Sequence, residues 1–245
     1  MKLQQLLSQT RKAIDEYQMI QDGDRIAVGI SGGKDSLTLL YALSNLRRFY
    51  PKKFEIEAIS VNIGFDGVDM SEIESLCRDL NVSYTIIDTE IAKIIFEERK
   101  ESNPCSLCAK MRKGSFNEKA KELNCNKIAY AHHKDDVIET LFLSFIFEGR
   151  LHSFSPVTYL DRMDLTLIRP MLFVSESDVI GFKNKYNLPI VKNPCPADGY
   201  TKREYAKNLV KQLSDEHPGA KERMFTAILN GNLQGWPQRI LTKRI

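Results

Sequence analysis

The sequence predicts an α/β protein: a doubly wound, mostly parallel sheet of five strands with helices on both faces and helical additions at both ends. Two observations support this fold class. Between residues 20 and 90, apolar runs typical of strands alternate with segments of helical periodicity, which calls for parallel strands joined by helices. In addition, the apolar run at 26–30 ends in Ser31-Gly32-Gly33, and a helical pattern follows at once.

Each element is placed by its own pattern. Strands are expected at 25–30, 54–63, 82–87, 127–131 and, for a short fifth, 165–168. Helices are expected at 2–20, 35–48, 71–80, 90–100, 105–123, around 137–145, at 175–187 and over most of 201–245. Ser71 is expected to cap the 71–80 helix, because Glu74 completes a capping box with it. The stretch 153–164, which contains Pro156, is expected to be irregular.

The elements group into three parts. An N-terminal helix occupies 1–22, and a nucleotide-binding α/β domain occupies 23–192, with an inserted helix that carries a Cys-x-x-Cys pair. The third part, 193–245, begins with a cysteine-containing loop and continues as a helical region. A chain of 245 residues is long enough to bury one sizeable core with such appendages.

Composition narrows the class of protein. Charged residues make up 27% and hydrophobic residues 42% of the chain, as in ordinary globular proteins. No apolar run approaches the roughly 20 residues that span a bilayer, and the N-terminus has no apolar signal core, so a cytoplasmic protein without a membrane partner is expected. Disulfides are rare in that compartment, so the five cysteines suggest metal binding, catalysis or burial.

The loop at 31–36, Ser-Gly-Gly-Lys-Asp-Ser, has the properties of an anion site. Glycines let the backbone approach a ligand, and the free N–H groups of the following helix point toward it. Two common phosphate motifs are absent: Val28 stands where a P-loop needs its first glycine, Asp35 follows Lys34, and there is no Gly-x-Gly-x-x-Gly. The alternative interpretation is a tight strand–helix turn capped by serine.

Polar side chains follow the other predicted strands where they end. Because ligands of parallel sheets bind beyond the carboxyl ends of the strands, these groups are expected to share one crevice with the loop at 31–36. Capping of the next helix is a compatible role for the two aspartates after the fourth strand. The groups are Asn62 and Asp66 after the second strand, Asp88 after the third, and His132, His133, Asp135 and Asp136 after the fourth.

The cysteines fall into two groups. Cys77 lies within a helical pattern and Cys125 just before a strand, so both are expected in the core. Cys105, Cys108 and Cys195 lie in exposed positions, the first two as a Cys-x-x-Cys pair. A closed zinc site normally has four ligands, although a histidine can be the fourth, whereas three ligands suit an iron–sulfur cluster with one open iron. Three free thiols are the remaining alternative.

Taken together, these motifs resemble those of a known family. The string at 31–36 resembles the PP-loop of ATP pyrophosphatases, which have the adenine nucleotide alpha hydrolase-like fold and cleave ATP between the α and β phosphates. With the cysteines, the chain resembles the tRNA 2-thiocytidine synthetase family over residues 28–195. The supporting strings are Cys-Ser-Leu-Cys-Ala-Lys-Met-Arg-Lys-Gly at 105–114, Ala-His-His-Lys-Asp-Asp at 131–136 and Arg-Pro at 169–170.

The resemblance implies an ATP-dependent tRNA sulfurtransferase. In that family the C2 oxygen of a cytidine is adenylated, pyrophosphate leaves, and sulfur replaces the activated oxygen. The implied cofactors are ATP, Mg²⁺ and a 4Fe-4S cluster, whose ligands here would be Cys105, Cys108 and Cys195. The implied partners are tRNA and a sulfur donor, either sulfide or a cysteine desulfurase product. One position departs from longer family members, because Asp198 replaces the second cysteine of a late Cys-x-x-Cys pair.

Roles follow for individual residues. Catalysis is assigned to Lys34 and Asp35 with the three cluster cysteines, and Asp35 is the expected Mg²⁺ ligand, with Asp135 or Asp136 as further candidates. His132 is expected to contact a phosphate or a base. The expected ATP-binding residues are Gly29, Ser31, Gly32, Gly33, Lys34, Asp35, Ser36, Asn62, His133 and Asp136.

A polyanion surface is the last expectation. The net charge of +3 supports it only weakly, but six cations flank the proposed cluster ligands. A homodimer packed through the terminal helices is also considered. Two other functions remain open: a PP-loop amidating ligase of the tRNA lysidine synthetase type, and a nucleotide-binding protein with a structural zinc site. The six expected RNA-binding residues are Lys110, Arg112, Lys113, Lys202, Arg203 and Lys207.

Overall fold

The computed structural model describes residues 1–65, 67–99, 104–191, 195, 202–231, 233 and 236. In this part of the chain one six-stranded sheet has the order β3-β2-β1-β4-β6-β5. Every neighbouring pair is parallel except β5 and β6, so the predicted fold class is confirmed. The strands are β1 (Asp24–Gly29), β2 (Phe54–Asn62), β3 (Ser83–Asp88), β4 (Lys127–Ala129), β5 (Val157–Leu160) and β6 (Leu165–Ile168).

The predicted number of strands was wrong by one, because β5 lies in the stretch expected to be irregular. β5 pairs with β6 as an antiparallel hairpin, with Leu160 opposite Leu165. Its side chains are only partly buried or, at Tyr159, exposed, so its pattern lacks the apolar signal of a central strand. A short strand at the sheet edge is held mainly by its backbone pairing, which composition does not reveal.

The helices largely follow the predicted periodicity. The 71–80 helix begins differently, because Met70 rather than Ser71 is its N-cap, and the Asp69 carboxylate accepts the Ser71 N–H at 2.8 Å. The helices are α1 (Leu3–Glu16), α2 (Lys34–Leu46), α3 (Ser71–Asp79), α4 (Ile91–Lys93) continued by the π-helical turn η1 (Ile94–Glu98), α5 (Pro104–Glu122), α6 (Lys134–Glu148), α7 (Glu176–Tyr186), α8 (Lys202–Glu216) and α9 (Ala220–Asn230).

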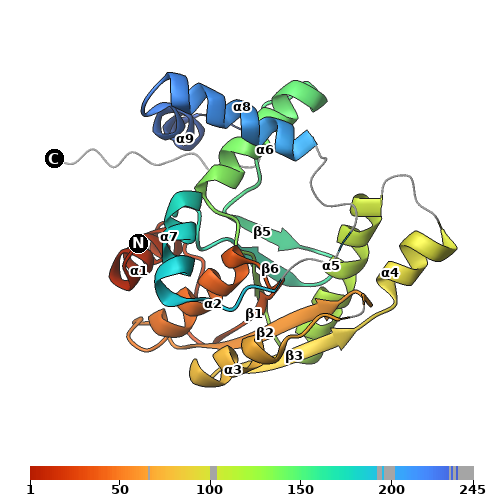
Figure 1. Cartoon of the computed structure of the whole chain (residues 1–245). Coiled ribbons are helices and arrows are strands. Elements are labelled where there is room, and N and C mark those ends of the chain that lie inside the picture. Colours follow the sequence, from red (N-terminus) through yellow and green to blue (C-terminus); the bar gives the residue numbers. More distant parts are fainter. Residues whose placement is uncertain are drawn as a thin grey trace.

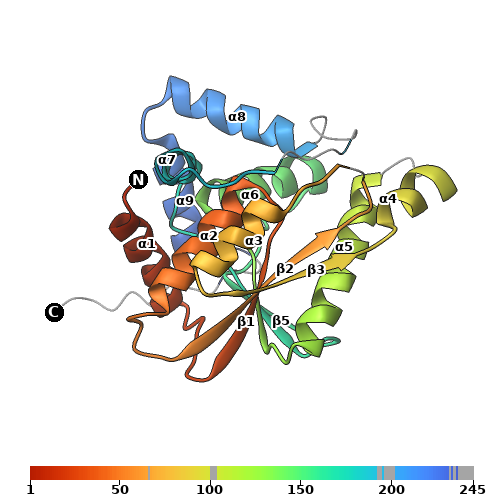
Figure 2. The same ribbon diagram turned by 60° about the horizontal axis from the view of Figure 1, so that its bottom comes forward.

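Helices cover both faces of the sheet, as Figure 2 shows, with α1, α2 and α3 on one side and α5 on the other. The strand residues alternate accordingly: Ile26 and Val28 lie in the larger core, and Ala27 lies in the smaller core with Phe116 of α5. This alternation is what buried parallel strands require. No helix in the described ranges is long and apolar enough to cross a membrane.

Both terminal helical regions add to the larger core. Leu6 and Ile14 of α1 are fully buried in it, and Val210 of α8 and Phe225 of α9 join it from the C-terminal side. Figure 1 shows α8 and α9 lying beside α6. The proposed boundary at 192/193 falls outside the described residues. The three-part division therefore stays a prediction.

Phe182 of α7 offers a test of this core. Its side chain is fully buried, and its ring lies 4.3 Å from Tyr186 and 5.4 Å from Tyr41, centroid to centroid. We expect Phe182→Ala to lower the free energy of unfolding by about 3–5 kcal/mol, because it leaves a cavity. Phe49→Ala is the matched control, since Phe49 is 56% exposed. Urea denaturation measures both, and equal losses would contradict this packing.

Candidate active site

The turn from β1 into α2 depends on Gly32. This residue has φ of +79°, a region that side chains with a Cβ rarely adopt. Its carbonyl accepts the Val191 N–H at 3.0 Å, and an added Cβ would lie 3.0 Å from Val191 Cβ. The glycine therefore fulfils two local requirements, the left-handed turn and the close approach of the segment after α7.

Serine hydroxyls hold the loop in shape. Ser36 Oγ donates to the Gly33 carbonyl at 3.0 Å and accepts the Ser31 N–H at 3.2 Å. Gly33 is the N-cap of α2 and brings no side chain to satisfy the first N–H groups of that helix. Such groups form a site for a phosphate. The predicted anion site thus has the expected strand–loop–helix geometry.

Lys34 and Asp35 stand at the start of α2 as a charged pair. Lys34 Nζ lies 3.0 Å from Asp35 Oδ2 and 3.3 Å from Glu176 Oε1 of α7. Burial acts to lower the pKa of Lys34, but the two carboxylates outweigh it and raise the pKa. The Lys34 ammonium group is therefore stabilised in its charged form. The other oxygen, Asp35 Oδ1, is buried and accepts no hydrogen bond from any described residue. A buried, unsatisfied carboxylate oxygen suits a hard cation such as Mg²⁺.

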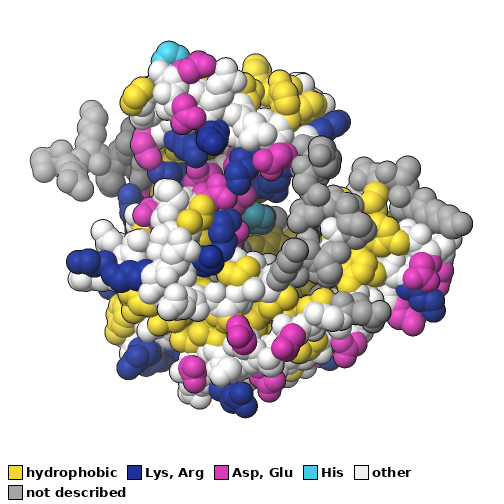
Figure 3. Space-filling model, viewed as in Figure 1, with side chains coloured by type: hydrophobic (Ala, Val, Ile, Leu, Met, Phe, Trp, Pro, Cys, Tyr) yellow, Lys and Arg dark blue, Asp and Glu magenta, His cyan; other side chains and the backbone are white. Residues whose placement is uncertain are grey.

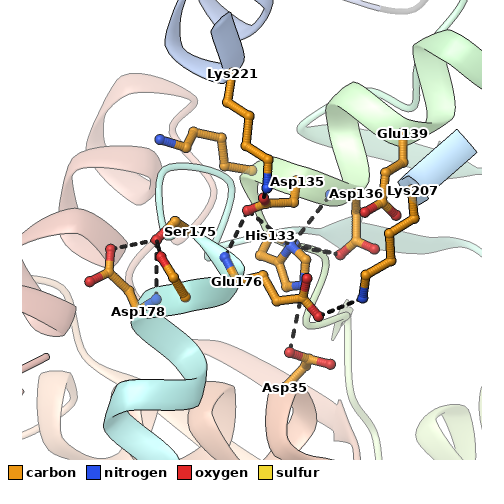
Figure 4. Close-up of polar contacts among 12 residues, drawn as sticks. Asp35, His133, Asp135, Asp136, Glu139, Ser175, Glu176, Asp178, Lys207 and Lys221 are labelled. Atoms are coloured by element: carbon orange, nitrogen blue, oxygen red, sulfur yellow. Dashed lines mark hydrogen bonds and ion pairs between the residues drawn. The ribbon is translucent and has the colours of Figure 1, made fainter. Parts of the chain in front are cut away.

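His133 begins α6 and faces Asp35 across the loop (Figure 4). Its backbone N–H donates to Asp136 Oδ2 at 2.9 Å, and its Nδ1 accepts the Asp136 N–H at 3.3 Å. This reciprocal pair is a capping box, so the capping role predicted for the aspartates is real for Asp136. His133 Nε2 lies 3.7 Å from Asp35 Oδ1.

Asp135 is buried and fully engaged. Its Oδ2 accepts the Glu176 N–H at 2.7 Å and its Oδ1 accepts from Lys221 Nζ of α9 at 2.6 Å (Figure 4). Burial acts to raise the pKa of Asp135, but these two hydrogen bonds outweigh it and hold the pKa below its ordinary value. Asp135 therefore joins three helices, and its oxygens are less available to a metal than Asp35 Oδ1.

Helix α8 brings two further cations to the acidic groups. Arg203 Nη2 lies 3.0 Å from Asp136 Oδ1, and Lys207 Nζ lies 2.9 Å from Glu176 Oε1. Behind them, burial and the neighbouring Asp136 carboxylate raise the pKa of Glu139 to about 7. Carboxylates and cations from α2, α6, α7 and α8 thus lie together in the site, and we call them the array. Its members are Lys34, Asp35, Asp136, Glu176, Arg203 and Lys207.

A cleft of about 530 Å³ opens beside this array. Figure 3 shows a hollow in the middle of this face, with charged side chains along its upper edge. Residues of the loop and of the cysteine-bearing helix α5 line the same cleft. Its lining consists of Gly29, Ile30, Ser31, Asp35, Ser36, Ile59, Val61, Ala109, Arg112, Lys113, Phe116, Tyr130, Ala131, His132 and Asp136.

His132 presents a neutral imidazole to the cleft. Burial, partly offset by Asp136, and the nearby Arg169 cation lower the pKa of His132 to about 4. Arg169 Nε donates to His132 Nδ1 at 3.3 Å, so the single ring proton resides on Nε2. Arg169 is itself buried against the Phe154 ring, and burial lowers its pKa to about 10. The pair supplies an N–H donor that stays uncharged at neutral pH.

The cysteines divide as predicted. Cys77 and Cys125 are buried, and burial raises the pKa of each thiol to about 11. Cys105 is exposed, and Cys108 and Cys195 are half-buried. Burial and the neighbouring thiols of Cys195 and Cys105 raise the pKa of Cys108, partly offset by Arg112. Cys108 therefore lies within electrostatic range of the two other predicted ligands.

Other predicted residues are placed as follows. Asn62 lies outside the cleft lining. Its Nδ2 donates to Asp88 Oδ1 at 2.9 Å, and its Oδ1 accepts the Gly64 N–H at 3.1 Å. Arg112 and Lys113, expected to contact RNA, line the cleft itself, and Lys110 is exposed on the same helix. Asp66 and Asp198 lie outside the described residues. Three residues in or near the array were assigned no role from the sequence. They are Glu176, Lys221 and Arg169, the last of which was named only as part of the Arg-Pro string.

Comparisons with known proteins identify the family of this chain. A model of the PP-loop domain family matches residues 2–213, so the class defined by the fold and the loop is that of the PP-loop proteins. The tRNA-cytidine(32) 2-sulfurtransferase of Geotalea daltonii is 39% identical over 96% of this chain and 92% of its own. Its counterpart in Syntrophotalea carbinolica is 40% identical over 95% of this chain and 89% of its own.

The chain therefore belongs to the tRNA-cytidine(32) 2-sulfurtransferase family within that class. The resemblance found in the sequence is confirmed. A solved structure shares the fold: the U34-tRNA thiolase NcsA from Methanococcus maripaludis, with its [4Fe-4S] cluster, aligns with a TM-score of 0.73 and 24% identity. That alignment covers 90% of this chain and 76% of the thiolase chain.

The two loop glycines give a matched test of the site. We expect Gly32→Ala to lower the free energy of unfolding by about 1–2 kcal/mol or more, because alanine resists a φ of +79° and its Cβ crowds Val191. Gly33→Ala should leave stability nearly unchanged, since Gly33 has φ of −82° and its added Cβ would meet only Ser31 Oγ at 3.4 Å. Urea denaturation compares them, and equal effects would refute the proposed loop geometry.

Proposed function

We propose that this protein is an ATP-dependent tRNA sulfurtransferase that adenylates the C2 oxygen of a cytidine and replaces that oxygen with sulfur. Family membership supports the predicted enzyme class. One observation carries the proposal: a single cleft is lined both by the PP-loop and by Ala109, Arg112 and Lys113 of the helix that bears Cys105 and Cys108. Activation and sulfur delivery can therefore act on one bound base.

The first half of the reaction uses the loop. The N–H groups at the start of α2 and the Ser36 hydroxyl bind the phosphates, and Lys34 stabilises the charge of the leaving pyrophosphate. Asp35 Oδ1 is the proposed ligand of Mg²⁺, which supplies further charge neutralisation when bound. The C2 oxygen attacks the α phosphorus, the bond to the β-phosphate oxygen breaks, and pyrophosphate leaves. The proposed ATP residues also include Gly29, Ser31, Gly32, Gly33, Asn62, His133 and Asp136.

The second half needs a sulfur nucleophile. It attacks C2, AMP leaves with the former base oxygen, and 2-thiocytidine remains, so no net oxidation or reduction of the base occurs. The neutral Nε2–H of His132 is available in the cleft to donate a hydrogen bond to an oxygen of the reacting group. Charge on that donor does not change near neutral pH, because the pKa of His132 is about 4.

Cys105, Cys108 and Cys195 are the proposed ligands of a 4Fe-4S cluster. Among the described residues, no group of three His, Cys, Asp or Glu side chains could hold a single metal ion. A 4Fe-4S cluster can be held by three thiolates, whereas a closed zinc site normally has four ligands, so a set of three cysteines suits the cluster better. With only three protein ligands, such a cluster supplies an open iron at which the incoming sulfur can bind.

tRNA is the proposed substrate, and sulfide or a cysteine desulfurase product is the proposed sulfur donor. Lys110, Lys113 and Lys202 are exposed and suited to RNA phosphates. Arg203 and Lys207 hold carboxylates of the site here, so contact of these two with RNA would require exchange of partners. A cytoplasmic location and a homodimer packed through the terminal helices remain predictions. The amidating and zinc-protein alternatives are not favoured by the family match.

Cysteine variants test the sulfur half of this function. In a strain that lacks the gene, we expect the wild-type protein to restore 2-thiocytidine in tRNA. We expect Cys105→Ser, Cys108→Ser and Cys195→Ser each to abolish it, because each removes a proposed cluster ligand. Mass spectrometry of tRNA nucleosides gives the readout.

Cys77→Ala is the matched control, since Cys77 is buried away from the cleft and should leave the thionucleoside present. Iron and sulfide analysis of protein purified without oxygen accompanies the assay. A thionucleoside that persists in the three serine variants would contradict the assignment of the ligands. Stoichiometric zinc without iron would contradict the cluster.

A further inference from the structure

Exposed apolar side chains gather where α6 ends and α8 begins. Phe145 is 61% exposed, Leu151 58% and Tyr205 56%, and Ile146 and Phe147 are also exposed. Figure 3 shows this hydrophobic patch at the top right, beside dark blue cationic side chains. Contacts join three of the side chains in this region, Phe147, Tyr205 and Lys202, which we call the platform. The core of the protein does not account for it, because these side chains face solvent.

Two aromatic rings and one cation lie together on the platform. The Phe147 and Tyr205 rings are edge-to-face with centroids 5.8 Å apart, and Lys202 Nζ lies 5.1 Å from the Phe147 centroid. Lys202 has no ion pair with a carboxylate of the described chain, whereas Arg150 nearby is neutralised by Glu148 at 2.7 Å. A lysine beside two exposed aromatic rings offers both a positive charge and flat apolar faces, which suits a ligand that carries phosphates and planar bases.

The platform is connected to the candidate active site through α6 and α8. Asp136 and Phe147 belong to the same helix, and eleven residues of α-helix rise by about 16 Å. From α8, Arg203 reaches Asp136, and its near neighbours Lys202 and Tyr205 belong to the platform. This separation matches a few nucleotides of unpaired RNA chain, so one RNA loop can reach both places.

We propose that the platform stacks unpaired bases of the RNA loop whose cytidine enters the cleft, while Lys202 binds a neighbouring phosphate. This inference rests on the proposed tRNA substrate. Exposed aromatic rings beside lysines are the common means by which proteins bind unpaired bases, since every base has a face that stacks. Lys113, which lines the cleft, and Lys110, which is exposed on the same helix α5, give the same polyanion a second cationic contact.

Equilibrium binding of a tRNA transcript tests the platform without requiring a loaded cluster. We expect Phe147→Ala and Tyr205→Ala each to weaken binding about 5- to 100-fold, because each removes a stacking surface. Lys202→Ala should reduce the slope of log affinity against log salt by about 0.7, as expected for one phosphate contact with single-stranded RNA. Phe49→Ala, which removes an exposed phenylalanine in the segment after α2, should bind as the wild type does.

Two further measurements separate the outcomes. A fully paired RNA hairpin stem should bind the wild type and the ring variants equally, and ATP binding should be unchanged in all of them. If the wild type fails to bind tRNA, the proposed substrate is wrong and the platform proposal falls with it. If the wild type binds and the ring variants bind equally well, the platform proposal alone is overturned. Loss of a dimer in sedimentation with unchanged RNA affinity would likewise overturn it, and would identify a contact between two copies.

Discussion

The buried carboxylate of Asp135 is the interaction on which the arrangement of the site depends. It is 2% exposed, and it accepts the first N–H of α7 and the Lys221 ammonium of α9 while belonging to α6. A buried carboxylate must be hydrogen-bonded, so these three helices cannot separate without a large free-energy cost. The N–H that Asp135 accepts from α7 belongs to Glu176, so this contact also fixes the position of Glu176. The Glu176 Oε1 atom then lies 3.3 Å from Lys34 Nζ in the PP-loop.

From this junction, charges compensate one another outward. Glu176 pairs with Lys34 and Lys207, and Asp136 pairs with Arg203. The exception is Asp35 Oδ1, a buried oxygen that no described residue satisfies. An acidic array that is balanced except at one buried oxygen of a cleft-lining residue is well suited to take one divalent cation with its nucleotide. The helices α8 and α9 thus contribute to the site and not only to the core.

Local physics made the loop predictable. The short turn between the end of β1 and the start of α2 needs one residue with a positive φ, and Gly32 has it. Predictions that depend only on a local pattern, such as the burial of Cys77 within a helix, were likewise correct. Strand β5 was missed because an edge hairpin has little apolar signal, and Ser71 was assigned as the cap although Asp69 supplies the bond. Glu176, Arg169 and Lys221 act across 14 to 86 positions of sequence, where no local pattern marks a partner.

The central claim is that the PP-loop cleft adenylates the base oxygen before sulfur replaces it. The most direct measurement uses tRNA labelled with ¹⁸O at C2 of the target cytidine, together with ATP, a sulfur source and the cluster-loaded protein. Mass spectrometry of the released nucleotide should find one ¹⁸O in the phosphate of AMP for each thiocytidine formed. AMP without the label, or the label released into water, would contradict the account.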